Sequence, residues 1–320
     1  MFNMFNRKIT IIGAGSVGAA TAYTLALTGI ASEIVLVDIN KEKAVGEALD
    51  IYHGTPLMDD PVDVISGDYA DAAGSNIVVI TSGLPRRPDQ TRLELTQTNV
   101  DIMKQIAPQI TAVCPDATYL IVSNPVDILT YAFIKLTGLP DNRVLGTGTL
   151  LDTARLRSYI ARSFDISQQS VHAYVLGEHG DSSFVPWSTC NISGMNPILN
   201  TERLLIAGQP APKLDCDAIE NHIRTSGAEI IRRKGCTNYA VSTAVHTVCE
   251  ALYGANSSIL AVSSMLHGEF GLENVALSLP TLIGYGAVQG HVMPSFTNDE
   301  VQKLLHSANA LKAVIDKLVL

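Results

Sequence analysis

The sequence has few cysteines, no long apolar run and no excess of basic residues, and each absence excludes a class of protein. Five cysteines in 320 residues, without paired spacing, argue against a disulfide framework and favour reduced thiols in a cytosolic protein. No apolar run approaches the ~18 residues of a membrane span, and residues 1–7 are too short and polar for a secretion signal. We therefore expect a cytoplasmic protein with no membrane partner.

Acidic residues outnumber basic ones by 31 to 22, which gives a formal net charge of -9. This balance argues against nucleic acid or an anionic membrane as a partner. An anionic substrate would have to be met by locally placed arginines. The length predicts about two domains, and a hydrophobic content of 47% is ample for sizeable cores.

The most informative pattern lies near the amino terminus, where the apolar run 8–12 leads into GAGSVG. The β-branched residues of this run predict a buried parallel strand, and the alanine-rich residues that follow predict a helix. Gly13 would permit the tight turn, Gly15 would let a pyrophosphate approach the backbone, and Gly18 would let the helix lie close to the strand. The phosphates would then bind amide donors at a helix N-terminus.

A second apolar run, 33–37, ends in Asp38, twenty residues after Gly18. A carboxylate at this position can accept hydrogen bonds from both ribose hydroxyls and would repel a 2'-phosphate. The pattern therefore predicts NAD rather than NADP as the cofactor. The alternative is an ordinary turn with a solvated aspartate.

Strands continue to alternate with helices along the first half, which is typical of a doubly wound parallel sheet. The predicted strands are 62–65, 77–81, 119–123 and 143–146. The helix predicted at 41–53 would bury Ala44, Ala48, Leu49 and Ile51. We expect the strand ending at Gly146 to close the sheet, and 146–149 to form a hinge between an NAD-binding Rossmann domain (1–147) and a mixed α+β catalytic domain (148–320).

The predicted elements of the second half are less informative about chemistry. The helices are expected at 149–163, 214–233, 237–253 and 299–318, and the strands at 258–266 and 275–283.

Ligands of such sheets bind beyond the carboxyl ends of the strands, and polar segments stand there. Residues 82–92 contain three arginines and two prolines. This composition is typical either of a lid that closes over a bound anion or of a solvated basic loop. Asn124 follows another strand and either contacts substrate or belongs to a turn. Asp152 and Arg155 would lie on one face of a helix, where they form either a surface ion pair or part of an active site. His179, between glycines, suits proton transfer, whereas the other seven histidines are predicted to be structural or exposed.

These segments together closely resemble the lactate/malate dehydrogenase family over essentially the whole chain. The resemblance is carried by GAGSVG with Asp38, the arginine loop ending at Arg92, SNPVD at 123–127, LDTAR at 151–155 and LGEHGDS at 176–182. It implies a Rossmann fold, NAD as cofactor and no metal. The residues it implies for cofactor binding are Gly13, Gly15, Ser16, Val17, Gly18, Asp38, Thr81, Gly83, Val122 and Asn124.

The resemblance also implies catalytic roles. His179 would exchange a proton with the substrate oxygen, and Asp152 would orient its ring and favour the protonated form. Arg155 would hold the C1 carboxylate of the substrate by a planar two-point contact. Arg92 would polarise the carbonyl, and Asn124 would fix the orientation of the substrate.

Three features indicate different 2-hydroxy acids. Arg86 stands six residues before Arg92, where malate dehydrogenases typically have arginine and lactate dehydrogenases glutamine. A second carboxylate needs a cationic partner, so Arg86 favours malate and oxaloacetate. Thr237 instead matches the threonine that lactate dehydrogenases place beside the substrate methyl, and the run 146–155 resembles hydroxyisocaproate dehydrogenases. We expect malate first and lactate second.

The resemblance further implies a homodimer or homotetramer. A protein that binds NAD without catalysis is a remote alternative, against which the intact set of acid, base and arginines argues. Gln169 and Thr189 replace the arginine and histidine of the effector site in sugar-phosphate-activated relatives. We therefore expect no activation by fructose bisphosphate, and strong stimulation in an activity titration would overturn this expectation.

Overall fold

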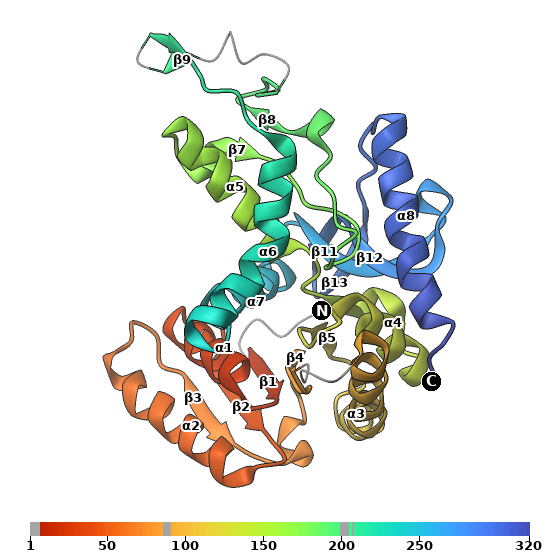
Figure 1. Ribbon diagram of the computed structural model, residues 1–320. Helices are drawn as coiled ribbons and strands as arrows, with labels where there is room; N and C mark the ends of the chain where they lie inside the picture. Colours follow the sequence, from red (N-terminus) through yellow and green to blue (C-terminus); the bar gives the residue numbers. More distant parts are fainter. Residues whose placement is uncertain (1–6, 86–90, 199–204, 207) are drawn as a thin grey trace.

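The computed structural model describes residues 7–85, 91–198, 205–206 and 208–320 (Figure 1). Of Arg92 it describes the backbone alone. The described residues form one nine-stranded sheet and two small two-stranded sheets, β7–β8 and β9–β10. None of the described helices is long and apolar enough to cross a membrane.

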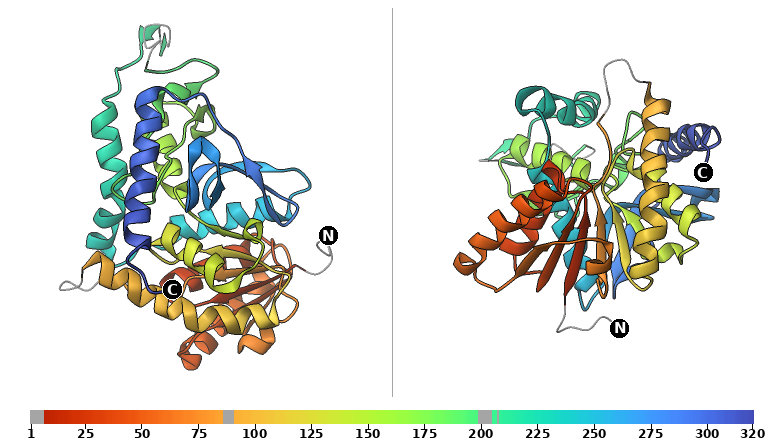
Figure 2. Two further views of the ribbon diagram at one scale, coloured as in Figure 1. Left: turned by 90° about the vertical axis from the view of Figure 1, so that its right-hand side faces the viewer. Right: turned by 90° about the horizontal axis from the view of Figure 1, so that it is seen from below.

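The first half of the chain forms the parallel sheet that the sequence predicts. Its strands are β1 (Lys8–Ile12), β2 (Glu33–Val37), β3 (Asp63–Ser66), β4 (Ile77–Ile80), β5 (Thr118–Ile121) and β6 (Val144–Gly146). They lie in the order β6-β5-β4-β1-β2-β3, with every neighbouring pair parallel. The helices are α1 (Ser16–Leu27), α2 (Lys41–Gly54), α3 (Arg92–Val113) and α4 (Val126–Thr137). The end-on view in Figure 2 (right) shows helices on both faces of this sheet, which confirms the doubly wound arrangement.

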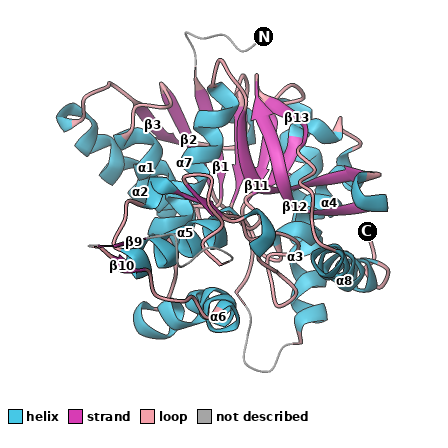
Figure 3. Ribbon diagram, turned by 90° about the horizontal axis from the view of Figure 1, so that it is seen from above, coloured by secondary structure: helices cyan, strands magenta, loops and turns pink. Residues whose placement is uncertain are grey.

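The sheet does not close at Gly146, and that prediction is wrong. Ser263 pairs antiparallel with Gly146, so three strands of the second half extend the sheet beyond β6 (Figure 3). These strands are β11 (Ser258–His267), β12 (Glu273–Gly284) and β13 (Ala287–His291). Their pairing covers the free edge of β6 and satisfies its backbone groups.

Two further differences have local causes. Leu49 is 49% exposed, because the buried stripe of α2 runs through Ala44, Ala48 and Ile51 and Leu49 lies about 100° away from Ala48. Helix α4 was not expected, because the Asn-Pro pair before it suggested only a turn; Pro125 instead precedes the first turn, where no amide donor is needed.

The expected hinge is a packed segment. A Cβ on Gly148 would lie 2.2 Å from the Ser278 hydroxyl oxygen, and the backbone amide of Thr149 donates to the same oxygen at 3.0 Å. Thr149 is fully buried. The segment is therefore packed against β11 and β12.

The described residues of the second half also form four α-helices and four short strands outside the large sheet. They are α5 (Leu150–Phe164), α6 (Cys216–Lys234), α7 (Tyr239–Tyr253) and α8 (Asn298–Ile315), with the short strands β7 (Val171–His172), β8 (Asn191–Ile192), β9 (Leu205–Ile206) and β10 (Gln209–Pro210). Figures 1 and 2 show α6 and α8 as long helices with the green segment around residue 180 between them. Arg224 of α6 donates to the carbonyl of Ser183, and Ser307 of α8 accepts from the amide of Glu178, so both helices hold that segment.

Candidate active site

The glycine-rich turn between β1 and α1 has the geometry that each glycine predicts. Gly13 has φ +108°, and a Cβ there would lie 2.8 Å from the Thr81 hydroxyl oxygen. A Cβ on Gly18 would lie 1.8 Å from the carbonyl oxygen of Gly13. Helix α1 can therefore lie this close to β1 only because residue 18 is a glycine. At Gly15 a Cβ would meet nothing within 4 Å. The backbone at Gly15 therefore borders open space that a phosphate could fill.

Neighbouring groups fit a dinucleotide at this turn. Asp38 Oδ2 accepts from the amide of Ala14 at 2.6 Å and Oδ1 from the amide of Asn40 at 2.8 Å, which holds the carboxylate at the end of β2. Helix α1 has no side-chain cap, so no side chain competes with a phosphate for its first amides. The Thr81 hydroxyl donates to the carbonyl of Gly13 at 2.9 Å and braces the turn.

Alanine at Gly15 and at Gly18 should have separable effects. Gly15→Ala is expected to leave the melting temperature unchanged and to raise the Kd for NADH about tenfold, because the methyl group occupies the space next to the amide donors. Gly18→Ala should instead cost about 1–3 kcal/mol of stability through overpacking. Thermal melts and NADH fluorescence titrations of both variants measure the contrast; a Gly15→Ala protein with wild-type NADH affinity would contradict the phosphate assignment.

A cleft of ≈ 350 Å³ lies beside this turn, between α1 and the helices α5, α6 and α7. Seven of the predicted site residues line it: Val17, Val122, Asn124, Asp152, Arg155, His179 and Thr237. The other described residues of the predicted site lie outside this lining, at the strand ends and in the glycine-rich turn. They are Gly13, Gly15, Ser16, Gly18, Asp38, Thr81 and Gly83. Arg86 and the side chain of Arg92 lie outside the described residues.

The centre of the cleft is a bonded row of three side chains. Nδ1 of His179 lies 2.6 Å from Oδ2 of Asp152, and Nη1 of Arg155 donates to Oδ1 of the same carboxylate at 2.7 Å. Asp152 and Arg155 come from one face of α5, whereas His179 comes from the segment between β7 and β8. The side chains of Asp152 and Arg155 are only 8% and 17% exposed. The ion pair is therefore part of the cleft and is not a surface pair.

Electrostatics within this row keep the imidazole protonated. Burial alone would lower the pKa of His179, but the Asp152 carboxylate outweighs it and raises that pKa to about 8. Asp127 adds to the rise and Arg155 opposes it. Burial likewise opposes charge on Asp152, yet the imidazole and the guanidinium lower the pKa of its carboxyl. The pair can thus hold a proton at neutral pH and release it to a bound oxygen.

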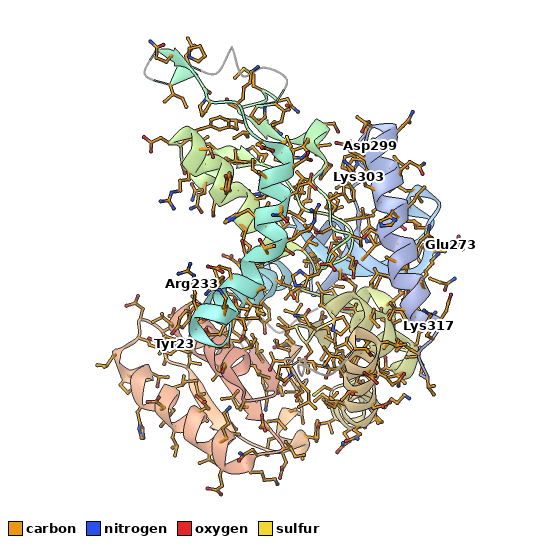
Figure 4. The ribbon with its side chains drawn as sticks, viewed as in Figure 1. Tyr23, Arg233, Glu273, Asp299, Lys303 and Lys317 are labelled. Atoms are coloured by element: carbon orange, nitrogen blue, oxygen red, sulfur yellow. The ribbon has the colours of Figure 1, made fainter. Side chains whose placement is uncertain are left out.

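Among the described residues that line the cleft, the two arginines are already paired with carboxylates. Arg155 bonds Asp152, and Nη2 of Arg224 lies 2.6 Å from Oε2 of Glu220. Two cations outside the cleft are paired as well. Arg233 lies 2.5 Å from Glu229, and Lys303 lies 2.8 Å from Asp299 on the first turns of α8 (Figure 4).

Sequence reasoning missed two residues that support the site. Asn99 of α3 is buried and joins the loop before residue 86 to a strand end, since its amide group bonds both backbone groups of Leu84 and the carbonyl of Asn124. Nothing near Asn99 in the sequence signals this role. Asp127 accepts from the backbone amide of His179 at 2.7 Å. It belongs to SNPVD, so the motif could have revealed it.

Comparisons with known proteins agree with this geometry. The profile described as "lactate/malate dehydrogenase, NAD binding domain" matches residues 7–146, and "lactate/malate dehydrogenase, alpha/beta C-terminal domain" matches residues 149–319. An L-lactate dehydrogenase of Thermoanaerobacter sp. (strain X514) is 46% identical over 97% of this chain and 99% of its own length. An L-lactate dehydrogenase of Acetivibrio thermocellus is 42% identical over 99% of this chain and 98% of its own length. The crystal structure of the minor L-lactate dehydrogenase of Enterococcus mundtii superposes with a TM-score of 0.92 at 36% identity, covering 98% of this chain and 99% of that one.

Proposed function

The chain belongs to the lactate/malate dehydrogenase family, and from this premise we propose that it is an L-lactate dehydrogenase that interconverts pyruvate and L-lactate. NAD-dependent oxidation of a 2-hydroxy acid is common to the family. The observation that carries the choice of lactate is that full-length relatives at 42–46% identity are named L-lactate dehydrogenase. These relatives favour lactate as the substrate, whereas Arg86 alone led us to expect malate.

The described part of the cleft favours a monocarboxylate. Both of its guanidinium groups have carboxylate partners. Arg155 bonds Asp152 through Nη1, whereas Arg224 bonds both Glu220 and the carbonyl of Ser183, so Arg155 is the cation that would bind a single substrate carboxylate. Thr237, Val241 and Ile231 offer a mostly apolar wall that suits a methyl group. Within this described lining, a second carboxylate would have to compete with Glu220 and the Ser183 carbonyl for Arg224.

This chain's residues would bind the keto acid and move one proton. When bound, NADH supplies the hydride that reduces the keto carbon. Because Nδ1 of His179 faces Asp152, Nε2 is the nitrogen left to donate a proton to the carbonyl oxygen. Arg155 would hold the C1 carboxylate, Asn124 would orient the substrate, and Arg92 would polarise its carbonyl. After the transfer His179 is neutral and regains its proton from solvent.

Malate and oxaloacetate remain the second candidate, because Arg86 occupies the position where malate dehydrogenases have arginine. The decisive measurement is kcat/KM for pyruvate and for oxaloacetate, in the wild type and in Arg86→Gln. We expect the wild type to prefer pyruvate. Arg86→Gln should lower kcat/KM for oxaloacetate at least about tenfold and change that for pyruvate little, since only oxaloacetate offers a second carboxylate. A wild-type preference for oxaloacetate would make malate the substrate.

Three further parts of the proposal stay predictions. They are a homodimer or homotetramer, a cytoplasmic location, and a division into domains at residues 147 and 148. The continuous sheet formed by β6 and β11 means that the two proposed domains share backbone hydrogen bonds.

A further inference from the structure

Two carboxylates bond to His179, one at its ring and one at its backbone amide. Asp152 of α5 bonds the ring, whereas Asp127 of α4 bonds the backbone, where its Oδ2 accepts the His179 amide at 2.7 Å. We propose that Asp127 is a positioning residue for the reaction. It holds the His179 backbone in place and supplies a second negative charge beside the imidazole. The inference rests on the proposed function for its catalytic meaning.

Burial makes this carboxylate unusual. Asp127 is 2% exposed, and its Oδ1 has no well-formed hydrogen bond among the described residues. The fully buried hydroxyl of Ser263 on β11 likewise lacks a well-formed partner, yet lies near enough to favour the charged carboxylate. Burying an aspartate with incomplete bonding costs free energy, which an apolar residue here would avoid. A carboxylate at this position is therefore not explained by packing alone.

The position of Asp127 on α4 lowers that cost. It is the second residue of the helix, where the partial positive charge of the helix N-terminus favours a carboxylate. Burial still raises its pKa to about 6, with the Ser263 hydroxyl and the His179 amide opposing the rise. Asp127 is thus charged above about pH 6, the range in which His179 must hold a proton.

The charged groups that act on the His179 ring come from two helices. They are Asp152 and Arg155 on α5 and Asp127 on α4, whereas Glu178, which precedes His179 in its segment of the chain, acts on Asp127. Ser307 of α8 anchors the same segment without charge, because its hydroxyl accepts the amide of Glu178 at 2.7 Å. Ser307 therefore offers a matched control: it makes the same kind of bond to the preceding residue and carries no electrostatic effect.

The test compares Asp127→Asn and Ser307→Ala with the wild type, using full-length protein. Histidine ring signals in NMR spectra give the pKa of His179, assigned by the signal missing from His179→Gln. Asparagine can still accept the amide bond, so Asp127→Asn removes mainly the charge and should lower that pKa by about one unit. With a wild-type pKa of about 8, kcat/KM for pyruvate should fall about fivefold at pH 8 and hardly at pH 6. Ser307→Ala should lower kcat equally at both pH values and leave the pKa unchanged.

Thermal melts and NADH titrations show that each variant is folded. An unchanged His179 pKa in Asp127→Asn would overturn the inference, and so would an equal shift in Ser307→Ala. Neither result depends on turnover, so the inference and the proposed function can fail separately. A wild type that reduces neither pyruvate nor oxaloacetate would overturn the function, whereas a shifted pKa in the same protein would still support the charge of Asp127.

Discussion

Replacing His179 by glutamine is expected to lower kcat for pyruvate reduction by ~10²–10⁴-fold, the range that general acid–base groups contribute. Glutamine is similar in reach and polarity but cannot hold and release a proton near neutral pH. His179 lies in the cleft and is not one of the groups of the glycine-rich turn, so the Kd for NADH should stay unchanged. Steady-state kinetics and fluorescence titration measure the two quantities. A variant that keeps more than about a tenth of the wild-type kcat would contradict the role of His179 as proton donor.

The pH dependence supplies a second test of the same residue. Pyruvate reduction needs the protonated ring, so wild-type kcat/KM should be constant at low pH and fall as pH rises through about 8. The residual activity of His179→Gln should lack this decline. Since the raised pKa belongs to the folded state, His179 contributes stability that is complete below pH 6.5 and is lost as pH rises through about 8. The melting temperatures of the two proteins should therefore converge at high pH.

The parallel sheet and the glycine-rich turn were predictable because their signals are local. An apolar run bounded by turn residues identifies a buried strand wherever it pairs. The tight turn at Gly13 and the close approach of helix to strand at Gly18 are both signalled by glycines within one short motif. The ion pair of Asp152 and Arg155 was visible for the same reason, because three residues along a helix fix both on one face. Its burial in the cleft was not visible.

What the sequence could not provide are contacts between distant segments. The pairing of Ser263 with Gly146 joins strands that no local pattern relates, so the sheet seemed to end at β6. The bond from the His179 amide to Asp127 spans 52 residues. Helical periodicity also misplaced Leu49, because a hydrophobic residue at the margin of the buried stripe of α2 can face solvent without a large cost. Tertiary packing decides each of these cases.

Replacing Arg155 by lysine is expected to lower kcat/KM for pyruvate about a hundredfold, chiefly through a higher KM. Lysine keeps the positive charge but loses the planar fork, which alone can bond the Asp152 carboxylate and a substrate carboxylate at the same time. A lost charge-assisted hydrogen bond of about 1.5–3 kcal/mol corresponds to roughly tenfold to more than a hundredfold in binding. Because the bond to substrate exists in both the ground state and the transition state, KM should change more than kcat. Initial rates over a range of pyruvate concentrations separate the two.

Arg157→Lys is the matched control, because it makes the same substitution two residues further along α5. Arg157 donates through Nε to the carbonyl of Ala173 and stacks over Tyr174, and it does not line the cleft. Its replacement should lower the melting temperature slightly while KM for pyruvate stays the same. If Arg155→Lys raised KM no more than Arg157→Lys does, the carboxylate of the substrate would have to bind elsewhere. Arg86, Arg92 or Arg224 would then be the group to replace next, since a carboxylate desolvated in a closed cleft still requires a cation.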